Sequence, residues 1–389
     1  MSVLPDAREI MTALVSFPTV SRDTNLPLID WVERYLSDLG VTAHRMPKEG
    51  DPTKEALFCS VGPEREGGIV LSGHTDVVPV DGQDWSSDPW TVTERDGKLY
   101  GRGTCDMKGF DALALHAVQY ALTQDLKRPL QIALSFDEEV GCMGAPPLIE
   151  AMQSAGLPKA ELAIIGEPSM MKCVTGHKGS SGFDVLVTGH EVHSSIMHQG
   201  VNAIMEAARL IDWANATNDE IRANAPSDLA AIFNPPFTTV HIGEISGGTA
   251  HNITAGSCRF GIDWRFTPDD DAAARLDAFR AFAGETEARM KETAETSSIE
   301  LRPFFDVPGL RPENDGAAET LVRSITGDNG THVVSYGTEA GHFQNAGYSA
   351  VVCGPGDIAQ AHQADEFISI EQLEAGEAFL RKVIHHLSN

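Results

Sequence analysis

The sequence predicts an α/β fold in which a mixed sheet is flanked by helices and a second domain is inserted. Apolar strand patterns alternate with helical patterns along the first half of the chain, which favours a largely parallel or mixed sheet with helices on both faces. After about His177 the order becomes β-α-β-β-α-β, which is typical of a ferredoxin-like sandwich. At 389 residues the chain also exceeds the usual size of one hydrophobic core, so two domains are expected.

The first domain begins with two helices and then alternates strands with helices. Apolar residues recur at helical spacing at Ile10 and Leu14, and again from Leu28 to Leu36, so both helices are expected to cover the sheet. Short apolar runs between turn residues predict the strands. In order, the remaining elements are strands at 41–45, 56–61 and 69–71, a helix at 107–122, a strand at 130–136, a helix at 147–153 and a strand at 162–165.

The inserted domain is expected to span residues 177–306, so that residues 1–176 and 307–389 together form the first domain. Its predicted elements are a strand at 182–188, a helix at 202–214, strands at 238–242 and 258–266, a helix at 272–293 and a strand at 299–304. After it the earlier pattern resumes, with a helix at 317–324, a strand at 350–353 and a last helix at 370–387.

The net charge argues against two common classes of partner. With 56 acidic against 29 basic side chains, the formal net charge is -27. Long-range repulsion disfavours binding of such a protein to phosphate backbones and to anionic lipid surfaces. We therefore expect neither nucleic acid nor a membrane as a partner.

The cysteines and the first residues predict a cytoplasmic protein. The six cysteines are scattered without a CxxC pair, unlike the framework of a secreted disulfide-rich domain. Asp6 and Arg8 stand where a signal peptide would need an uninterrupted apolar core, and no later run approaches a membrane span. No export is predicted, and a reducing compartment fits best.

Three apolar strands end in polar residues that could share one pocket. The run 69–71 leads through Ser72-Gly73 to His74, the run 130–136 leads to two glutamates, and the run 162–166 leads to a third. Sites in α/β sheets form in the crevice outside the carboxyl ends of the strands. A glycine-flanked loop before a predicted helix supplies a further carboxylate. The candidates for this pocket are His74, Asp106, Glu138, Glu139 and Glu167.

These residue types suit a metal-dependent hydrolase. Imidazoles and carboxylates are the ligands expected for zinc in a hydrolytic site that keeps an open position for water. A shared carboxylate could hold two ions close together, and Asp106 is the natural bridge. Asp76 lies two residues after His74, on the same side of an extended segment, and could accept the second ring N–H of that histidine. We expect Asp76 to orient His74 rather than to bind metal.

The adjacent Glu138 and Glu139 predict a division of roles. On extended backbone their side chains point in opposite directions, so one can bind metal while the other serves as general base. Taken singly, a His-X-Asp pair, a Glu-Glu edge and a Gly-Glu-Pro turn are each also typical of ordinary loops. Their coincidence at three strand ends favours the metal site.

Six segments resemble the dinuclear zinc aminoacylase and exopeptidase family, which includes deacetylases, desuccinylases, aminoacylases and carboxypeptidases. The match covers nearly the whole chain. It implies a zinc-exopeptidase-like catalytic domain, with the insert as a lid and dimerisation domain. The segments are SGHTDVVPV (72–80), GRGTCDMKG (101–109), SFDEEVGCMG (135–144), IGEPS (165–169), HSS with GVNAI (193–204) and AHQADEF (361–367).

The resemblance implies two zinc ions per subunit, for which cobalt can substitute. Glu138 is the implied general base and Asp76 the implied partner of His74. The peptide bond after Asp106 is expected to be cis, and Cys105 is expected to pack, with metal binding or oxidation as alternatives. The implied ligands are His74 and Glu167 for one ion, Glu139 and His362 for the other, and Asp106 as the bridge.

The resemblance also implies a homodimer that acts on a small N-acyl amino acid. His193 is expected to reach the site of the other subunit and to stabilise the tetrahedral oxyanion there. Asn252 and Arg265, on strands of the insert, are similar to positions that bind the substrate's α-carboxylate, for which a guanidinium gives bidentate geometry. Gly337 and Thr338 are further substrate-binding positions.

The segments 336–344 and 353–367 are most similar to family members that hydrolyse N-acetyl-L-ornithine. The implied reaction yields L-ornithine and acetate, a step of arginine biosynthesis. Glu339, beside the substrate-binding positions, is our own hypothesis for pairing with the ammonium group of ornithine. A succinyl-diaminopimelate desuccinylase, a broad aminoacylase and a dipeptidase share the metal chemistry and differ only in the pocket. A metal-binding dimer without catalysis is the other alternative, but it would not need Glu138 as a base.

Overall fold

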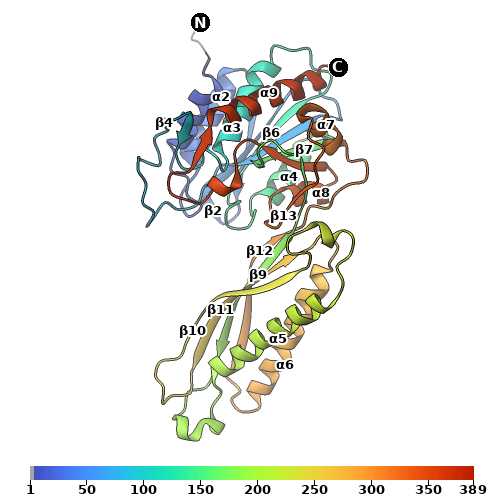
Figure 1. Ribbon diagram of the computed structural model, residues 1–389. Helices are drawn as coiled ribbons and strands as arrows, with labels where there is room; N and C mark the ends of the chain where they lie inside the picture. The colour runs from blue at the N-terminus through green and yellow to red at the C-terminus, as the bar shows by residue number, and fades with distance from the viewer. Residues whose placement is uncertain (1–3) are drawn as a thin grey trace. The chain divides into compact units, whose positions relative to one another are not determined.

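A computed structural model describes residues 4–389, and the chain in it folds as two units (Figure 1). The first unit contains the residues up to Gly176 together with Leu310–Val333 and Thr338–Asn389, and the second contains His177–Gly309 and Val334–Gly337. The chain leaves the second unit after Gly309 rather than after residue 306, because the last strand of that unit runs on to Val307. Residues 334–337, which were expected in the first domain, belong to the second unit.

The first unit is built on an eight-stranded mixed sheet whose three central strands carry the predicted pocket. β3 (Ile69–His74) pairs in parallel with β6 (Leu130–Ser135) on one side and with β7 (Leu162–Pro168) on the other. Every residue of these three strands is buried, which explains why they appear in the sequence as nearly continuous apolar runs. Their carboxyl ends therefore meet at one edge of the sheet.

The remaining strands extend this sheet on both sides. The order across it is β1-β2-β6-β3-β7-β14-β8-β13. The outer strands are β1 (Ala43–Lys48), β2 (Asp51–Val61), β14 (Ser349–Gly354), β8 (Val174–His177) and β13 (His332–Val334).

Helices form layers against the sheet of the first unit. One hydrophobic core joins it to helices α1 (Ala7–Val15), α2 (Leu26–Asp38), α3 (Lys108–Ala121), α7 (Ala317–Thr326) and α9 (Ile370–Leu387). Helices α4 (Ala145–Ser154) and α8 (Ala340–Asn345) pack on each other and on the sheet, and contribute no residue to that core. The helices of residues 4–389 are all too short or too polar to cross a bilayer.

A small second sheet joins two distant segments of the first unit. β5 (Lys98–Tyr100) pairs with β4 (Thr93–Arg95) on one edge and with β15 (Phe367–Ser369) on the other. Tyr100 lies opposite Phe367 in the register. These strands are not predicted from the sequence, because three residues are too few to show a periodic pattern. The pairing brings the loop before Asp106 beside the loop after His362.

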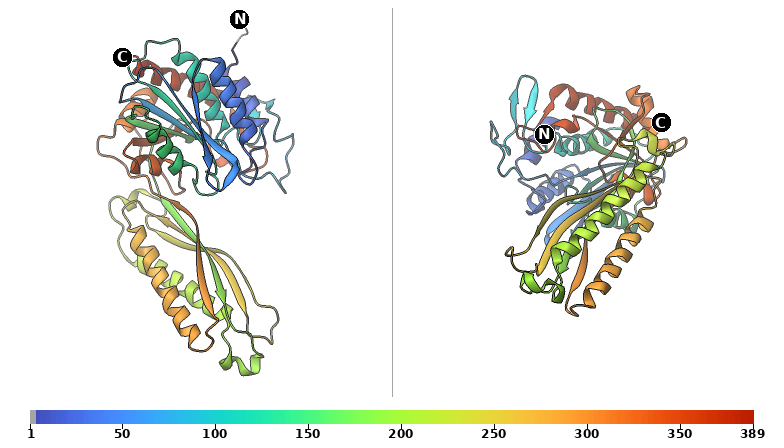
Figure 2. Two further views of the ribbon diagram at one scale, coloured as in Figure 1. Left: turned by 180° about the vertical axis from the view of Figure 1, so that it is seen from behind. Right: turned by 60° about the horizontal axis from the view of Figure 1, so that its bottom comes forward.

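The second unit has the predicted ferredoxin-like arrangement, and the expected α/β fold class is confirmed (Figure 2). Its antiparallel sheet has the order β10-β11-β9-β12, and two helices pack against it. The second-unit helix predicted to end at residue 214 continues to Ala223, because Thr217 and Ile221 prolong its buried face. The elements are β9 (Gly179–Thr188), α5 (Ala203–Ala223), β10 (Thr239–Gly247), β11 (Ser257–Phe266), α6 (Ala272–Lys291) and β12 (Ser298–Val307).

Candidate metal centre

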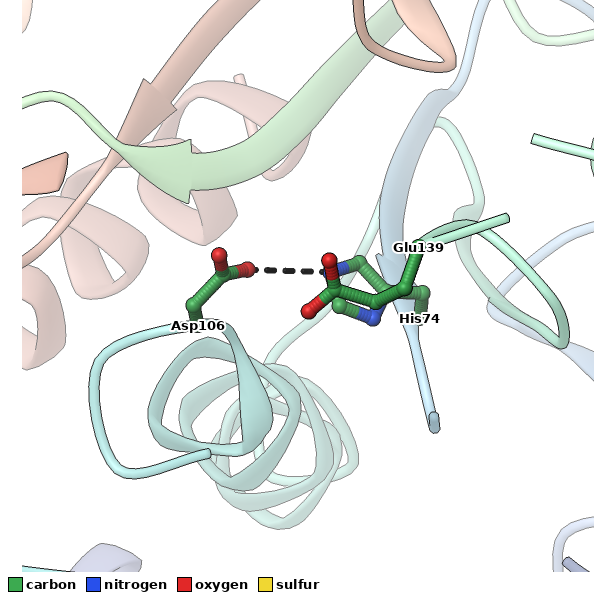
Figure 3. Close-up of side chains that lie close together, drawn as sticks. All are labelled: His74, Asp106 and Glu139. Carbon is green, nitrogen blue, oxygen red and sulfur yellow. Dashed lines mark hydrogen bonds and ion pairs between the residues drawn. The ribbon is translucent and has the colours of Figure 1, made fainter. Parts of the chain in front are cut away.

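The strand ends of the first unit bring the predicted pocket residues together. His74 is the last residue of β3, Glu167 lies near the end of β7, and the two glutamates follow β6. Asp106 directly precedes the segment that opens α3. In Figure 3 the side chains of His74, Asp106 and Glu139 point toward one another from three separate segments. The peptide bond after Asp106 is cis, as expected.

Asp106 lies between two imidazoles, one at each carboxylate oxygen. Its Oδ1 is 3.1 Å from His74 Nε2, and its Oδ2 is 3.3 Å from His362 Nε2. His74 comes from the middle of the sheet, whereas His362 comes from a surface loop about 290 residues further along the chain and is 54% exposed in its side chain. This arrangement is the one that a bridging carboxylate would need.

The remaining acids divide into two groups around this bridge. Glu167 Oε1 lies 3.6 Å from His74 Nε2, and Glu138 Oε2 lies 4.0 Å from the same nitrogen. Glu139 Oε2 instead lies 2.9 Å from His362 Nε2. The ligand atoms of His74, Asp106 and Glu139 fall within 4.8 Å of one another, and so do those of His74, Glu138 and Glu167.

The chemistry of this cluster fits divalent cations. Glu139 Oε1 and Glu167 Oε1 are buried and have no hydrogen-bond partner among residues 4–389. Burial is the main cause that raises the pKa of Glu138 to about 8 and that of Glu139 to about 7, and nearby carboxylates act in the same direction. Hydrogen bonds to Asp106 and Glu139 raise the pKa of His362 to about 10. Metal ions are the counter-charges that hold such acids ionised, and imidazole with carboxylate suits zinc.

Asp76 contacts His74 differently from the prediction. The acceptor near His74 Nδ1 is the main-chain carbonyl of Asp76, at 2.9 Å, whereas the carboxylate oxygen is 3.6 Å away. The Asp76 carboxylate instead accepts the main-chain N–H groups of Glu138 and Glu139, at 3.1 and 3.3 Å, and the hydroxyl of Ser21, at 2.7 Å. It therefore orders the segment that carries both glutamates.

Two lysines that the sequence analysis overlooks support the same segment. Asp137 has a left-handed backbone, with φ of 55°, and its carboxylate accepts from Lys48 Nζ at 2.6 Å and from the buried Lys54 Nζ. Lys54 also donates to the carbonyl of Ser21. Lys54 belongs to β2, a strand with mixed burial, where a single lysine is indistinguishable from a surface residue by sequence pattern.

A further pair that the sequence analysis does not assign is Arg102 with Glu366. Both lie inside segments that carry the family resemblance, 101–109 and 361–367, and both are almost fully buried. A buried arginine implies a buried partner, so burial is the signal that identifies them. Cys105, directly before Asp106, is buried, and its Sγ lies 3.4 Å from the carbonyl of Asp357.

The predicted substrate residues of the first unit are buried close to the centre. Glu339 Oε2 accepts from Ser72 Oγ on β3 at 3.1 Å, and its Oε1 accepts from Ser135 Oγ on β6. Burial raises the pKa of Glu339 to about 7. Thr338 is buried as well, and its Oγ1 accepts from the N–H of Ala340 at the start of α8, at 3.1 Å.

The other predicted substrate residues belong to the second unit. His193 is exposed, and its Nδ1 lies 2.8 Å from Ser195 Oγ. Arg265 lies on β11 with its Nε 3.4 Å from Asp263. Asn252 lies in the turn between β10 and β11 rather than on a strand, because β10 ends at Gly247. Gly337 is also part of this unit.

Known proteins match this chain, in sequence and in fold, over most of its length. A sequence model described as peptidase family M20/M25/M40 matches residues 70–386. The chain is 37% identical over 398 residues to an acetylornithine deacetylase of Myxococcus xanthus, with 98% of each protein covered. It is similar in fold to an M20-family metallo-carboxypeptidase of Sulfolobus solfataricus, with TM-score 0.79, 16% identity and 99% of each chain covered. A dinuclear metal-binding peptidase of Bacillus subtilis is also similar, with TM-score 0.62, 14% identity and coverage of 98% of this chain and 97% of that one.

Proposed function

Because the chain belongs to peptidase family M20/M25/M40, we propose that it is a metal-dependent amide hydrolase that converts N-acetyl-L-ornithine and water into L-ornithine and acetate. The single observation that carries the chemistry is Asp106, whose two carboxylate oxygens each face an imidazole. The choice of substrate rests on the full-length similarity to proteins named acetylornithine deacetylase. The product would serve arginine biosynthesis.

Two zinc ions would be held by the residues around this aspartate, and cobalt could replace them. His74 and Glu167 would bind one ion, Glu139 and His362 the other, and Asp106 both. When bound, such a pair of ions would polarise the scissile carbonyl and lower the pKa of water, so that the water loses a proton more readily and becomes a better nucleophile. The similar Bacillus subtilis peptidase, itself described as dinuclear, supports a two-ion site.

Glu138 would move the proton in this reaction. Its carboxylate accepts a proton from the attacking water as the oxygen bonds to the acetyl carbon, and the same proton passes to the nitrogen as the C–N bond breaks. The released amine and acetate together contain all the atoms of the substrate and the water. Hydrogen bonds from the Glu138 and Glu139 N–H groups to Asp76 hold the base and its neighbouring ligand in place for both transfers.

We infer a homodimer in which His193 of one subunit serves the site of the other. An exposed apolar patch lies near His193 in the second unit, and such patches mark protein interfaces. Ile253 pairs with His193 in a β-bridge, and Ile204 approaches the turn after β10. The side chains of this patch are Ile196, Met197, Ile204, Met205 and Ile253, which are 39–49% exposed.

Five residues would recognise the substrate. Asn252 and Arg265 would bind the α-carboxylate of the acetylated amino acid, together with Gly337 and Thr338. Glu339 would provide the negative charge that favours the ornithine ammonium.

We also infer a cytoplasmic location for the protein. The six cysteines are all free and buried, which suits a reducing compartment.

The direct test is substrate preference of the purified protein loaded with zinc or cobalt. Release of free amine is compared for N-acetyl-L-ornithine, N-succinyl-L,L-diaminopimelate and N-acetyl-L-methionine. The proposal requires strong preference for acetylornithine, and loss of activity with a chelator and in Glu138→Ala. Preference for another substrate would point to a desuccinylase or a broad aminoacylase with the same centre. No turnover by a protein that holds two metals would favour the non-catalytic alternative.

A further inference from the structure

A buried ion pair joins the two loops that supply Asp106 and His362. Arg102 Nη1 lies 2.7 Å from Glu366 Oε2, and both side chains are 1% exposed. The two residues are 264 positions apart in the chain. Burying both charges removes their hydration, and a buried pair therefore adds little net folding stability. What such a pair does supply is a fixed geometry between the segments it joins.

Glu366 reaches the main chain of the proposed bridging ligand. Its Oε1 accepts the N–H of Cys105 at 2.9 Å and the N–H of Asp106 at 3.0 Å. One carboxylate thus contacts Arg102 through one oxygen and the backbone of Asp106 through the other. Displacement of Glu366 would release the backbone that positions the bridging side chain.

Arg102 reaches the loop of His362 by two routes. Its Nη2 donates to Gln83 Oε1 at 2.6 Å, and Gln83 Nε2 donates to the carbonyl of His362 at 2.9 Å. Its Nη1 also donates to the carbonyl of Gln363, at 3.3 Å. His362 itself has a left-handed backbone, with φ of 63°, which is uncommon for a residue other than glycine.

The other half of the metal centre has a different support. His74 ends β3 and pairs with Ser135 of β6 in the sheet. Glu167 lies on β7, whose residues on either side of it pair with β14. Asp106 and His362 stand on loops, and the short pairing of β5 with β15 ends just where Gly101 N–H donates to the Glu366 carbonyl, at 3.0 Å. Beyond that point the side chains of Arg102 and Glu366 make hydrogen bonds from one loop to the other.

We propose that Arg102 and Glu366 are positioning residues that fix the spacing of Asp106 and His362 and thereby set the affinity of the ion held by Glu139 and His362. This inference rests on the proposed two-ion centre. Groups that orient ligands without touching the metal commonly change metal affinity by about 10- to 100-fold when they are replaced. The effect should fall mainly on this ion, because Asp106 and His362 both stand on the loops that the pair joins. The other ion shares Asp106, but its ligands His74 and Glu167 stand on strands of the sheet.

The test is a zinc titration of the metal-free full chain against a chelating indicator, with metal content per chain measured after dialysis. His74→Ala and His362→Ala identify which binding step belongs to which ion. Glu366→Gln is the main variant, and Glu319→Gln is the matched control, because Glu319 pairs with Arg323 on α7, away from the proposed ligands. Gln83→Leu cuts the link to His362 without leaving a buried charge unpaired.

The expected result is that Glu366→Gln weakens the step assigned to His362 by about 10- to 100-fold and the other step by a clearly smaller factor. The Glu319→Gln protein should keep wild-type affinity for both ions. Gln83→Leu should weaken the same binding step by a smaller factor. If Glu366→Gln does not fold, the affinity of the Gln83→Leu protein for this ion tests the proposal instead. Unchanged affinity, or equal weakening of both steps, would overturn the inference while the two-ion centre stands. A wild-type chain that binds fewer than two ions would overturn the proposed centre as well.

Discussion

The Asp76 carboxylate accepts a hydrogen bond from the main-chain N–H of Glu138, with 3.1 Å between the nitrogen and Oδ1. Its other oxygen accepts the N–H of Glu139 at 3.3 Å and the hydroxyl of Ser21 at 2.7 Å. One side chain at the end of β3 therefore orders the segment after β6, where the proposed base and a proposed ligand stand side by side. In the proposed centre, Asp76 would therefore act through the backbone of these two glutamates rather than by binding an ion.

Asp76→Asn should lower kcat for acetylornithine by about 10- to 100-fold with a smaller change in KM. The amide can accept one of the two N–H groups but turns a donor toward the other, so the Glu138–Glu139 segment loses its fixed position. The measurement is steady-state kinetics at saturating zinc. Asp81→Asn, which changes an exposed aspartate paired with Arg22 at 2.5 Å, is the matched control. Equal kinetics in the two variants would contradict this role of Asp76.

The two lysines on Asp137 should differ in their contribution to stability. Lys54→Met leaves the buried Asp137 with one exposed partner, and should reduce the free energy of unfolding by about 3 kcal/mol. Lys48→Met removes a lysine that is about a third exposed, and should cost no more than about 1 kcal/mol. Urea unfolding of both variants, with metal removed, measures the difference. A larger loss of unfolding free energy in Lys48→Met than in Lys54→Met would show that the exposure of each lysine does not determine its contribution to stability.

The parts of the fold that the sequence could predict are those with long or regular burial. β3, β6 and β7 are buried on both faces, so their apolar runs are visible, and both long helices of the second unit have periodic apolar faces. β5 and β15 have three residues each and depend on each other for pairing. Their existence follows from tertiary contacts that no local pattern records.

The same distinction applies to the candidate centre. His74, Glu138 and Glu167 follow apolar runs, so topology alone brings them to one edge of the sheet. The placement of Asp106 between two histidines was expected from the family resemblance alone, because His362 lies on a distant loop. The Arg102–Glu366 pair joins residues 264 positions apart, which no local pattern relates. The acceptor role of Asp76 was also out of reach, because its partners are main-chain N–H groups that carry no residue-specific signal.

Glu339→Gln should reduce activity on N-acetyl-L-ornithine far more than activity on N-acetyl-L-methionine. The carboxylate lies buried against Ser72 and Ser135, and the neutral amide keeps an acceptor for one of these hydroxyls while losing the charge that favours an ammonium. The ratio of kcat/KM for the two substrates is the measurement. Equal losses would assign Glu339 to support of the strand ends instead, and Ser135→Ala, which keeps the charge, should leave the ratio unchanged.

His342 should make the protein lose stability in mild acid. Burial lowers the pKa of this histidine on α8 to about 4, and its Nε2 has no hydrogen-bond partner among residues 4–389. The unfolded chain takes up a proton near the ordinary histidine pKa of about 6.5, whereas the folded chain does so only near 4. The stability that neutral His342 contributes is therefore complete above about pH 6.5 and is lost progressively as the pH falls toward 4. Urea titrations at several pH values between about 6.5 and 4 measure the free energy of unfolding. As the pH falls over this range, the free energy of unfolding of His342→Gln should decrease by about 1–3 kcal/mol less than that of the wild type. The exposed His198 provides the control, because His198→Gln should follow the wild-type pH dependence; identical curves for all three proteins would exclude His342 as the cause.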